Sequence, residues 1–462
     1  MTDDVDLQRR LTGLAERSAP PPRADLADVV VARHRARHRQ ALGAAGLAAA
    51  VAALVVASTT LLPGGPAAEP AGAASVDLPA AEPAPEPPGV DVLAGPARGP
   101  LAGDAAFLDG VRRLPWADAG TDVPPGSRRV VFAGDVAGGR WALVAGTASG
   151  TDDTALAWFS GPPGAPAEQL RPAGVPVVVD PARPVARADN GTGALVVVAA
   201  PGDAVELSSR PDVAADGTSS RAWQPVDAPD GVVVTTLPPG AAPYATAVRY
   251  RVVRDGVEVA TAVPDGHSST AAAPAPAAVE WVRPQPPPAA GDAAVAGAVA
   301  EVLGATGLTP AEVTVAALWA GDVPGPHDRP ARVTLLAVTL PSGAVYLTAP
   351  FGYGTADGSV LGGSCGSGVQ AAGVAPADQA LVVRCDVPDG TADAATTSSL
   401  VVLAPQAATA QAVDMTGVAL TAFPLVDGVA VVDAPERTAS VAASADDGRS
   451  WRLRLLATAD LG

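Results

Sequence analysis

The chain has 462 residues and a net charge of −18 at pH 7, from 30 basic and 48 acidic side chains. Every basic residue is an arginine, so chemistry that needs lysine, such as Schiff-base formation or a Walker phosphate-binding loop, is excluded. Residues 1–41 carry a net charge of +2 and the remainder −20. Nucleic-acid binding needs a basic face, so we expect no nucleic-acid partner.

The first 40 residues predict a cytoplasmic helical arm. Leu7, Leu11 and Leu14 recur at helical spacing, a run of prolines ends that helix, and Asp25 is a plausible N-cap for a second one. Two short helices cannot bury a core. Residues 1–40 are therefore expected to form an arm rather than a domain.

Residues 41–62 carry no charge and are long enough to cross a bilayer as one helix. The basic cluster just before them consists of Arg33, Arg35, Arg37 and Arg39. The positive-inside rule then predicts a cytoplasmic N-terminus and an extracellular C-terminus. A cleaved signal peptide is the alternative, but signal peptides have much shorter segments before the apolar run.

The basic cluster itself has two interpretations. It sets topology and contacts anionic lipids of the bilayer, or it lies on a helix that docks a cytoplasmic protein partner. His34 and His38 share a helical face there and could chelate a metal, but further ligands are lacking. Residues 63–103 follow the span, are rich in proline and alanine, and predict a disordered stalk.

The remaining chain contains two stretches with the same order of motifs, which predicts tandem extracytoplasmic repeats at residues 104–270 and 291–462, joined by a Pro-rich linker at 271–290. Each repeat opens with Gly-Asp-Ala-Ala and a helix-like segment. The hairpin-like run from Arg129 is matched with the run from Arg332, and the Asp-Gly pair at Asp230 with the pair at Asp427.

These patterns predict a mainly β fold. Each repeat is expected to be a helix plus an antiparallel sheet leading into a small, loosely immunoglobulin-like β-sandwich. The Cys…Trp…Cys spacing of true immunoglobulin domains is absent. A β-propeller is the main alternative, although two copies of this length do not resemble uniform blades.

Cys365 and Cys385 are the only cysteines, and both follow the predicted span. In an oxidising exterior, a pair 20 residues apart predicts a disulfide, with two free thiols as the alternative.

The segment from Ser444 to Trp451 fits the pattern S-x-D-x-G-x-x-W, with Asp446 and Gly448 at the inner positions. It resembles the Asp-box of sialidase-type propellers, in which the motif holds a hairpin turn. The resemblance covers eight residues and implies a structural role.

No catalytic set is predicted. Residues 362–366 fit the G-x-S-x-G pattern of a nucleophile elbow, but the flanking sequence looks like a loop and no histidine follows His327. Asp386, Asp389 and Asp393 lack the spacing of a calcium-binding loop. We therefore expect no enzyme activity, no cofactor and no metal.

The layout resembles that of actinobacterial single-pass membrane proteins, some of them anti-sigma-like. The matching stretches are Leu11–Arg17 and the basic cluster. This resemblance implies a short cytoplasmic arm and an exterior domain. Two functions follow as hypotheses: a membrane-anchored binding or envelope protein with a cell-wall or protein ligand outside, and a transmembrane signalling regulator with a cytoplasmic partner. An extracellular hydrolase is a third, less favoured class.

Overall fold

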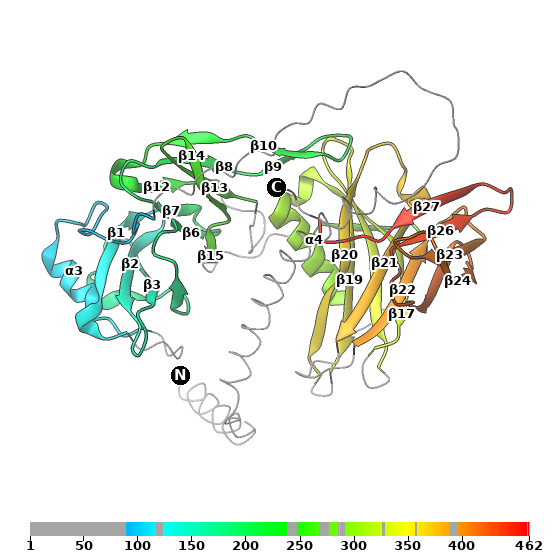
Figure 1. The fold of residues 1–462 in the computed structure, drawn as a ribbon, viewed down its shortest axis with the longest axis horizontal. Helices are drawn as coiled ribbons and strands as arrows, with labels where there is room; N and C mark the ends of the chain where they lie inside the picture. The colour runs from blue at the N-terminus through cyan, green and yellow to red at the C-terminus, as the bar shows by residue number, and fades with distance from the viewer. Residues whose placement is uncertain are drawn as a thin grey trace, which may run out of the picture. The chain divides into compact units, whose positions relative to one another are not determined.

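The computed structural model describes residues 89–116, 123–237, 247–267, 277–284, 286, 292–325, 329–355, 358–388, 396–459 and 461. The predicted arm, the predicted membrane helix and the basic cluster of arginines lie outside these residues. No helix of the described part is both long enough and apolar enough to cross a membrane. All the described residues belong to one compact unit, and most of its elements are labelled in Figure 1.

The first half of this unit begins with a helix packed on a sheet. The Asp104 carboxylate caps the helix by accepting a hydrogen bond from the Phe107 amide at 3.0 Å. Phe107 and Val111 point inward and join the apolar core against the sheet. The elements are α3 (Ala105–Arg112), β1 (Arg129–Val136), β2 (Gly139–Thr147), β3 (Thr154–Gly161), β4 (Arg171–Pro172) and β5 (Val177–Val179), with β4 and β5 both pairing with β3.

The segment just before α3 belongs to this fold, so the predicted stalk ends too late. Val92 and Leu93 are each only 1% exposed, and Leu93 packs in the core. Arg98 pairs in parallel with Phe132 of β1. Two adjacent apolar residues therefore anchor a proline-rich stretch that composition alone marks as disordered.

Two further sheets complete the first half. The strand β7 (Ala194–Val198) is buried on both faces, with Val196 and Val198 packing on the first sheet and Leu195 and Val197 on the third. The middle sheet has the order β12 (Val232–Thr236), β7, β6 (Val185–Asp189), β15 (Asp265–His267). The third has the order β11 (Gln224–Val226), β8 (Ala204–Ser208), β13 (Arg249–Arg254), β14 (Val257–Ala262), and β9 (Pro211–Val213) and β10 (Ser219–Arg221) form a separate hairpin.

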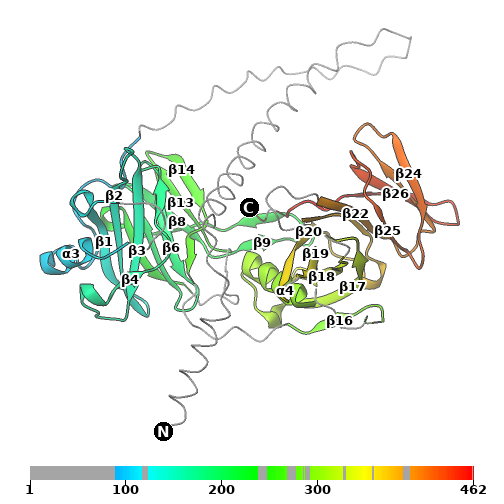
Figure 2. The same ribbon diagram turned by 90° about the horizontal axis from the view of Figure 1, so that it is seen from below.

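The second half has a longer helix, α4 (Asp292–Thr306), which packs through an apolar core on a five-stranded sheet (Figure 2). That sheet has the order β16 (Val279–Trp281), β17 (Thr314–Val323), β18 (Ala331–Thr339), β19 (Val345–Gly354), β20 (Val360–Gln370). Because β16 lies inside the predicted linker, the boundary at residue 290 is wrong. Two more sheets follow. One has the order β21 (Leu381–Pro388), β22 (Thr396–Leu403), β25 (Val429–Asp433). The other has the order β24 (Ala419–Pro424), β23 (Thr409–Val413), β26 (Ser440–Ser444), β27 (Ser450–Arg454).

The strand orders of the two halves correspond. The order β12-β7-β6 parallels β25-β22-β21, and β11-β8-β13-β14 parallels β24-β23-β26-β27. Each helix-bearing sheet also starts with a parallel edge segment and a bulged strand, with the bulge beside Val131 in β1 and Leu318 in β17. By its place after the helix and beside the edge segment, β1 resembles β17, whereas the run from Arg332 forms β18.

The predicted mainly β class with several sheets is confirmed. The sheets are not purely antiparallel, because β15 pairs in parallel with β6 and β16 with β17. In each half the sheets pack face to face through apolar cores.

Candidate functional site

A pocket of about 260 Å³ lies beside α3. We call it the α3 pocket. Its lining comprises Gly95, Ala97, Ala105, Leu108, Asp109, Arg112, Arg129 and Val130. Gly95, Ala105 and Arg112 are exposed, so a solute can reach it from the surface. Its volume is slightly below the roughly 300–1,000 Å³ typical of pockets for drug-sized ligands, so a ligand would be small.

One stripe of α3 forms a wall of this pocket. Ala105, Leu108, Asp109 and Arg112 follow the spacing i, i+3, i+4, i+7, which places them on one face of the helix. The other face carries Phe107 and Val111 into the core. The helix is therefore held by its apolar face, while a stripe with both apolar and charged side chains borders the pocket.

The end of α3 is fastened by Arg128. Its guanidinium donates to the Leu114 carbonyl oxygen at 2.7 Å and to that of Val123 at 2.9 Å, and lies 5.2 Å from the Trp116 ring centroid. These contacts hold the chain that leaves the helix against β1, which fixes where Arg112 stands.

Both arginines of the pocket have partners: their ion pairs are exposed, whereas the Leu93 carbonyl belongs to a buried residue. Arg112 forms an ion pair with Asp109, and both side chains are about half exposed. The Arg129 Nε donates to the Leu93 carbonyl oxygen at 3.1 Å, and its Nη2 lies 3.7 Å from a carboxylate oxygen of Asp91. Exposed pairs of this kind contribute roughly 0–1 kcal/mol, so a ligand could exchange with them at small cost.

The lining contains groups that can bind an anion. It contains guanidinium groups, which match carboxylate and phosphate oxygens. It contains no serine, cysteine or histidine that could act as a nucleophile or a general base. Within the described residues there is also no group of three or more His, Cys, Asp or Glu side chains that could hold a metal ion.

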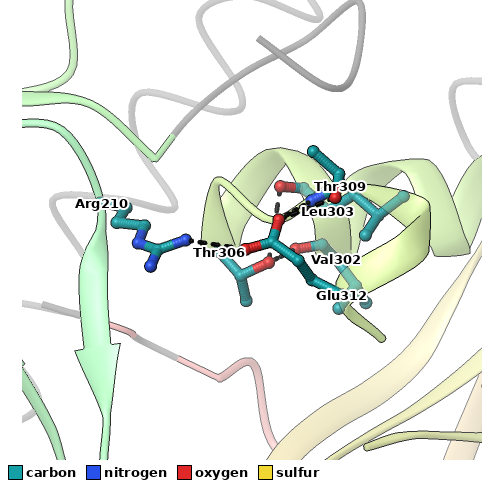
Figure 3. A network of polar contacts seen from close by, with 6 residues as sticks. All are labelled: Arg210, Val302, Leu303, Thr306, Thr309 and Glu312. Atoms are coloured by element: carbon teal, nitrogen blue, oxygen red, sulfur yellow. Dashed lines mark hydrogen bonds and ion pairs between the residues drawn. The ribbon is translucent and has the colours of Figure 1, made fainter. Parts of the chain in front are cut away.

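A second, smaller pocket of about 90 Å³ lies between β9, the end of α4 and the β18–β19 turn. Figure 3 shows the polar network beside it. Glu312 accepts hydrogen bonds from the amide and hydroxyl of Thr309, and Arg210 approaches its other oxygen at 3.5 Å. The bonds from Thr309, followed by the Arg210 charge, lower the pKa of Glu312. This network connects Arg210, just before β9, with Glu312 of the second half, and its contacts are structural.

The two cysteines lie at disulfide distance, as the sequence predicts, with Cα atoms 4.4 Å apart. Cys365 is in β20 and Cys385 in β21, so the pair links two sheets that share a core. Residues 362–366 are part of β20, which corrects the expectation of a loop there. The glycines run along the strand rather than around a nucleophile elbow.

The Asp-box-like segment forms the β26–β27 hairpin, with Ser444 at the end of β26 and Trp451 in β27. Gly448 has a φ of +84°, which a side chain would strain. Asp447, one residue after the predicted Asp446, accepts a bond from the Arg449 amide at 3.1 Å. Trp451 packs against the adjacent core.

The other candidate positions do not assemble into a site. His34, His38, His327, Asp389 and Asp393 lie outside the described residues. Asp386 accepts hydrogen bonds from the Ser398 hydroxyl at 2.5 Å and from Arg384 at 3.1 Å.

Sequence reasoning missed two buried polar contacts. Arg98 is 7% exposed and donates to the carbonyl oxygens of Val92 and Ala199 at 2.6 Å and of Asp230 at 3.2 Å. Burial lowers its pKa. Arg254 forms two hydrogen bonds with the buried Asp203. No local pattern marks these residues, because their partners are far away in the chain.

Comparisons with known proteins identify no relative. No family model matches the chain, and neither the curated proteins nor the solved structures contain a match.

Proposed function

We propose that the chain is a membrane-anchored, extracytoplasmic β-rich binding protein. The observation that carries the binding role is the α3 pocket, an accessible hollow with an apolar floor and arginines in its lining. Its guanidinium groups, which match carboxylate and phosphate oxygens, and its lack of serine, cysteine and histidine favour binding over hydrolysis.

The anchor rests on residues 41–62 and on the arginines before them. The uncharged run has the length of a spanning helix, and the positive-inside rule places the described residues outside the cell. The disulfide-distance cysteine pair supports an oxidising exterior.

We also propose that the exterior part arose by duplication. Arg98 and Arg283 support this, because each donates to the backbone carbonyl of the aspartate in an Asp-Gly pair, Asp230 and Asp427 respectively. Both aspartates have positive φ, at +53° and +51°. An arginine that donates to the aspartate carbonyl of an Asp-Gly turn in each half is consistent with two copies of one ancestral module.

The orientation is tested with membrane vesicles from cells that express the full chain with a C-terminal epitope. Protease should destroy the epitope in right-side-out vesicles and leave it intact in inverted ones. The reverse pattern contradicts the proposal. Deleting residues 41–62 should release the protein into the soluble fraction, whereas deleting 66–87, of the same length, should not.

The binding role is tested by crosslinking intact cells and identifying what is attached to the chain. Cell-wall or exterior protein partners are expected. Recovery of cytoplasmic partners alone, lost on deletion of residues 1–30, would favour a signalling regulator instead.

A further inference from the structure

We infer that the α3 pocket binds a small organic acid, whose carboxylate pairs with Arg112 and whose apolar end lies on Ala97, Leu108 and Val130. This inference rests on the proposed binding function and specifies its ligand. Four observations carry it.

The first observation is that the second half has a large side chain on the same side of its edge segment, although Trp281 lies two residues before Arg283 and Ala97 one residue before Arg98. There Trp281 of the edge strand β16 pairs with Ala317 and packs into the core between α4 and its sheet. In the first half the edge residue packed on the helix side is Ala97, beside Val130. The helix side of the edge segment thus accommodates an indole in the second half, whereas in the first half it has a methyl group and a pocket.

The second observation is the charge of the helices. Counting from the shared Gly-Asp-Ala-Ala motif, α4 has Gly297 and Ala300 where α3 has Asp109 and Arg112. The helix of this fold therefore does not require a charged stripe. The charged residues thus occur on the helix that borders the α3 pocket and are missing at the matching positions of α4.

The third observation is the exchangeable partner of Arg112. Both side chains of its ion pair with Asp109 are about half exposed, and the two residues are three apart on the helix. Such a pair contributes little to stability. A ligand carboxylate can accept two parallel hydrogen bonds from the planar guanidinium and replace Asp109 there. Asp109 would then compete with the ligand.

The fourth observation is the floor. Ala97, Leu108 and Val130 come from three separate segments and present only apolar side chains to the pocket. The hollow measures about 260 Å³. A branched acid of a few carbons fits this space, whereas a bare inorganic anion would leave the apolar floor unused.

The test measures binding of 4-methylpentanoate to the full chain in detergent by calorimetry, with 4-methylpentanamide as the neutral probe and inorganic phosphate as the bare anion. The acid should bind, and the amide and phosphate should bind at least tenfold more weakly. Equal binding of the amide or of phosphate overturns the inference, as does absence of binding by the acid.

Variants locate the site. Arg112→Gln should weaken binding of the acid at least tenfold, and Asp109→Asn should strengthen it severalfold by removing the competitor. Arg113→Gln is the matched control, because Arg113 is exposed at the same helix end and does not line the pocket. Equal effects of Arg112→Gln and Arg113→Gln would contradict the assignment.

Ala97→Trp places an indole into the pocket, on the side of the edge segment where the second half has Trp281. It should abolish binding of the acid. Its thermal unfolding midpoint should stay within a few degrees of that of the parent, which shows that binding is lost because the pocket is filled and not because the protein is unfolded. Unchanged binding by a folded Ala97→Trp overturns the location. Failure of these tests leaves the vesicle result on anchoring and orientation unaffected, so the two proposals fail separately.

Discussion

Arg98 donates to the backbone carbonyl oxygen of Asp230, 132 residues further along the chain, and thereby ties the edge of the first sheet to a turn of the middle sheet. The same guanidinium bonds Ala199 and Val92. One buried cation thus supplies donors to three carbonyl groups that would otherwise lack them.

Replacing Arg98 with Met should lower the free energy of unfolding by about 2–4 kcal/mol, because charged hydrogen bonds to buried carbonyls are lost while the apolar stem is kept. Urea denaturation measures this. Arg283→Met is the control, since its bond to Asp427 is exposed and should contribute less than about 1 kcal/mol. Equal losses would show that burial does not decide the effect.

Arg254→Leu should destabilise the protein by about 3–5 kcal/mol, because it leaves the Asp203 carboxylate buried without its partner. The two side chains are 10% and 2% exposed, with bonds of 2.8 and 2.9 Å. Arg332→Leu breaks a 2.8 Å pair with Asp322, whose carboxylate is 53% exposed and stays solvated without its partner, although Arg332 itself is only 12% exposed. It should change stability by about 1 kcal/mol or less. Chemical denaturation of both variants makes the comparison, and a similar loss in both would refute it.

Stability should fall at alkaline pH because of Tyr250. Burial, with the Asp265 charge adding to it, raises the pKa of Tyr250 to about 12. A raised folded-state pKa means that the contribution is complete below the unfolded value of about 10 and is lost as pH rises toward about 12. The loss should be about 2–3 kcal/mol.

Urea unfolding of the parent and of Tyr250→Phe, measured between neutral pH and about pH 12, tests this expectation. The variant lacks the ionisable hydroxyl, so its stability should decline less over the alkaline range. Parallel decline of the two proteins would assign the effect to other groups.

Replacing both Cys365 and Cys385 with Ser should cost about 3 kcal/mol, because the link closes a loop of 20 residues and removes that entropy from the unfolded chain. A reducing agent should move the parent to the stability of the double variant and leave the double variant unchanged. A parent insensitive to reduction at its unfolding midpoint would contradict a contribution from the link.

Sequence patterns located much of the fold. The hairpins at β1–β2 and β18–β19 follow from apolar runs around a glycine-containing turn, and both helices follow the Gly-Asp-Ala-Ala motifs. The patterns failed where partners are distant. The parallel edge segments before α3 and α4 have proline-rich sequences, and only pairing with β1 and β17 reveals the bridge at Arg98 and the strand β16.

The sequence by itself determined the β class, the cysteine pair and the charge division, because periodicity, count and composition are local properties. Only the tertiary structure decided the buried arginine contacts and the α3 pocket. Ala97, Leu108 and Val130 share no pattern in the chain. They line one pocket because the helix and the edge segment pack against the same strand, and that depends on contacts among segments that the linear order does not record.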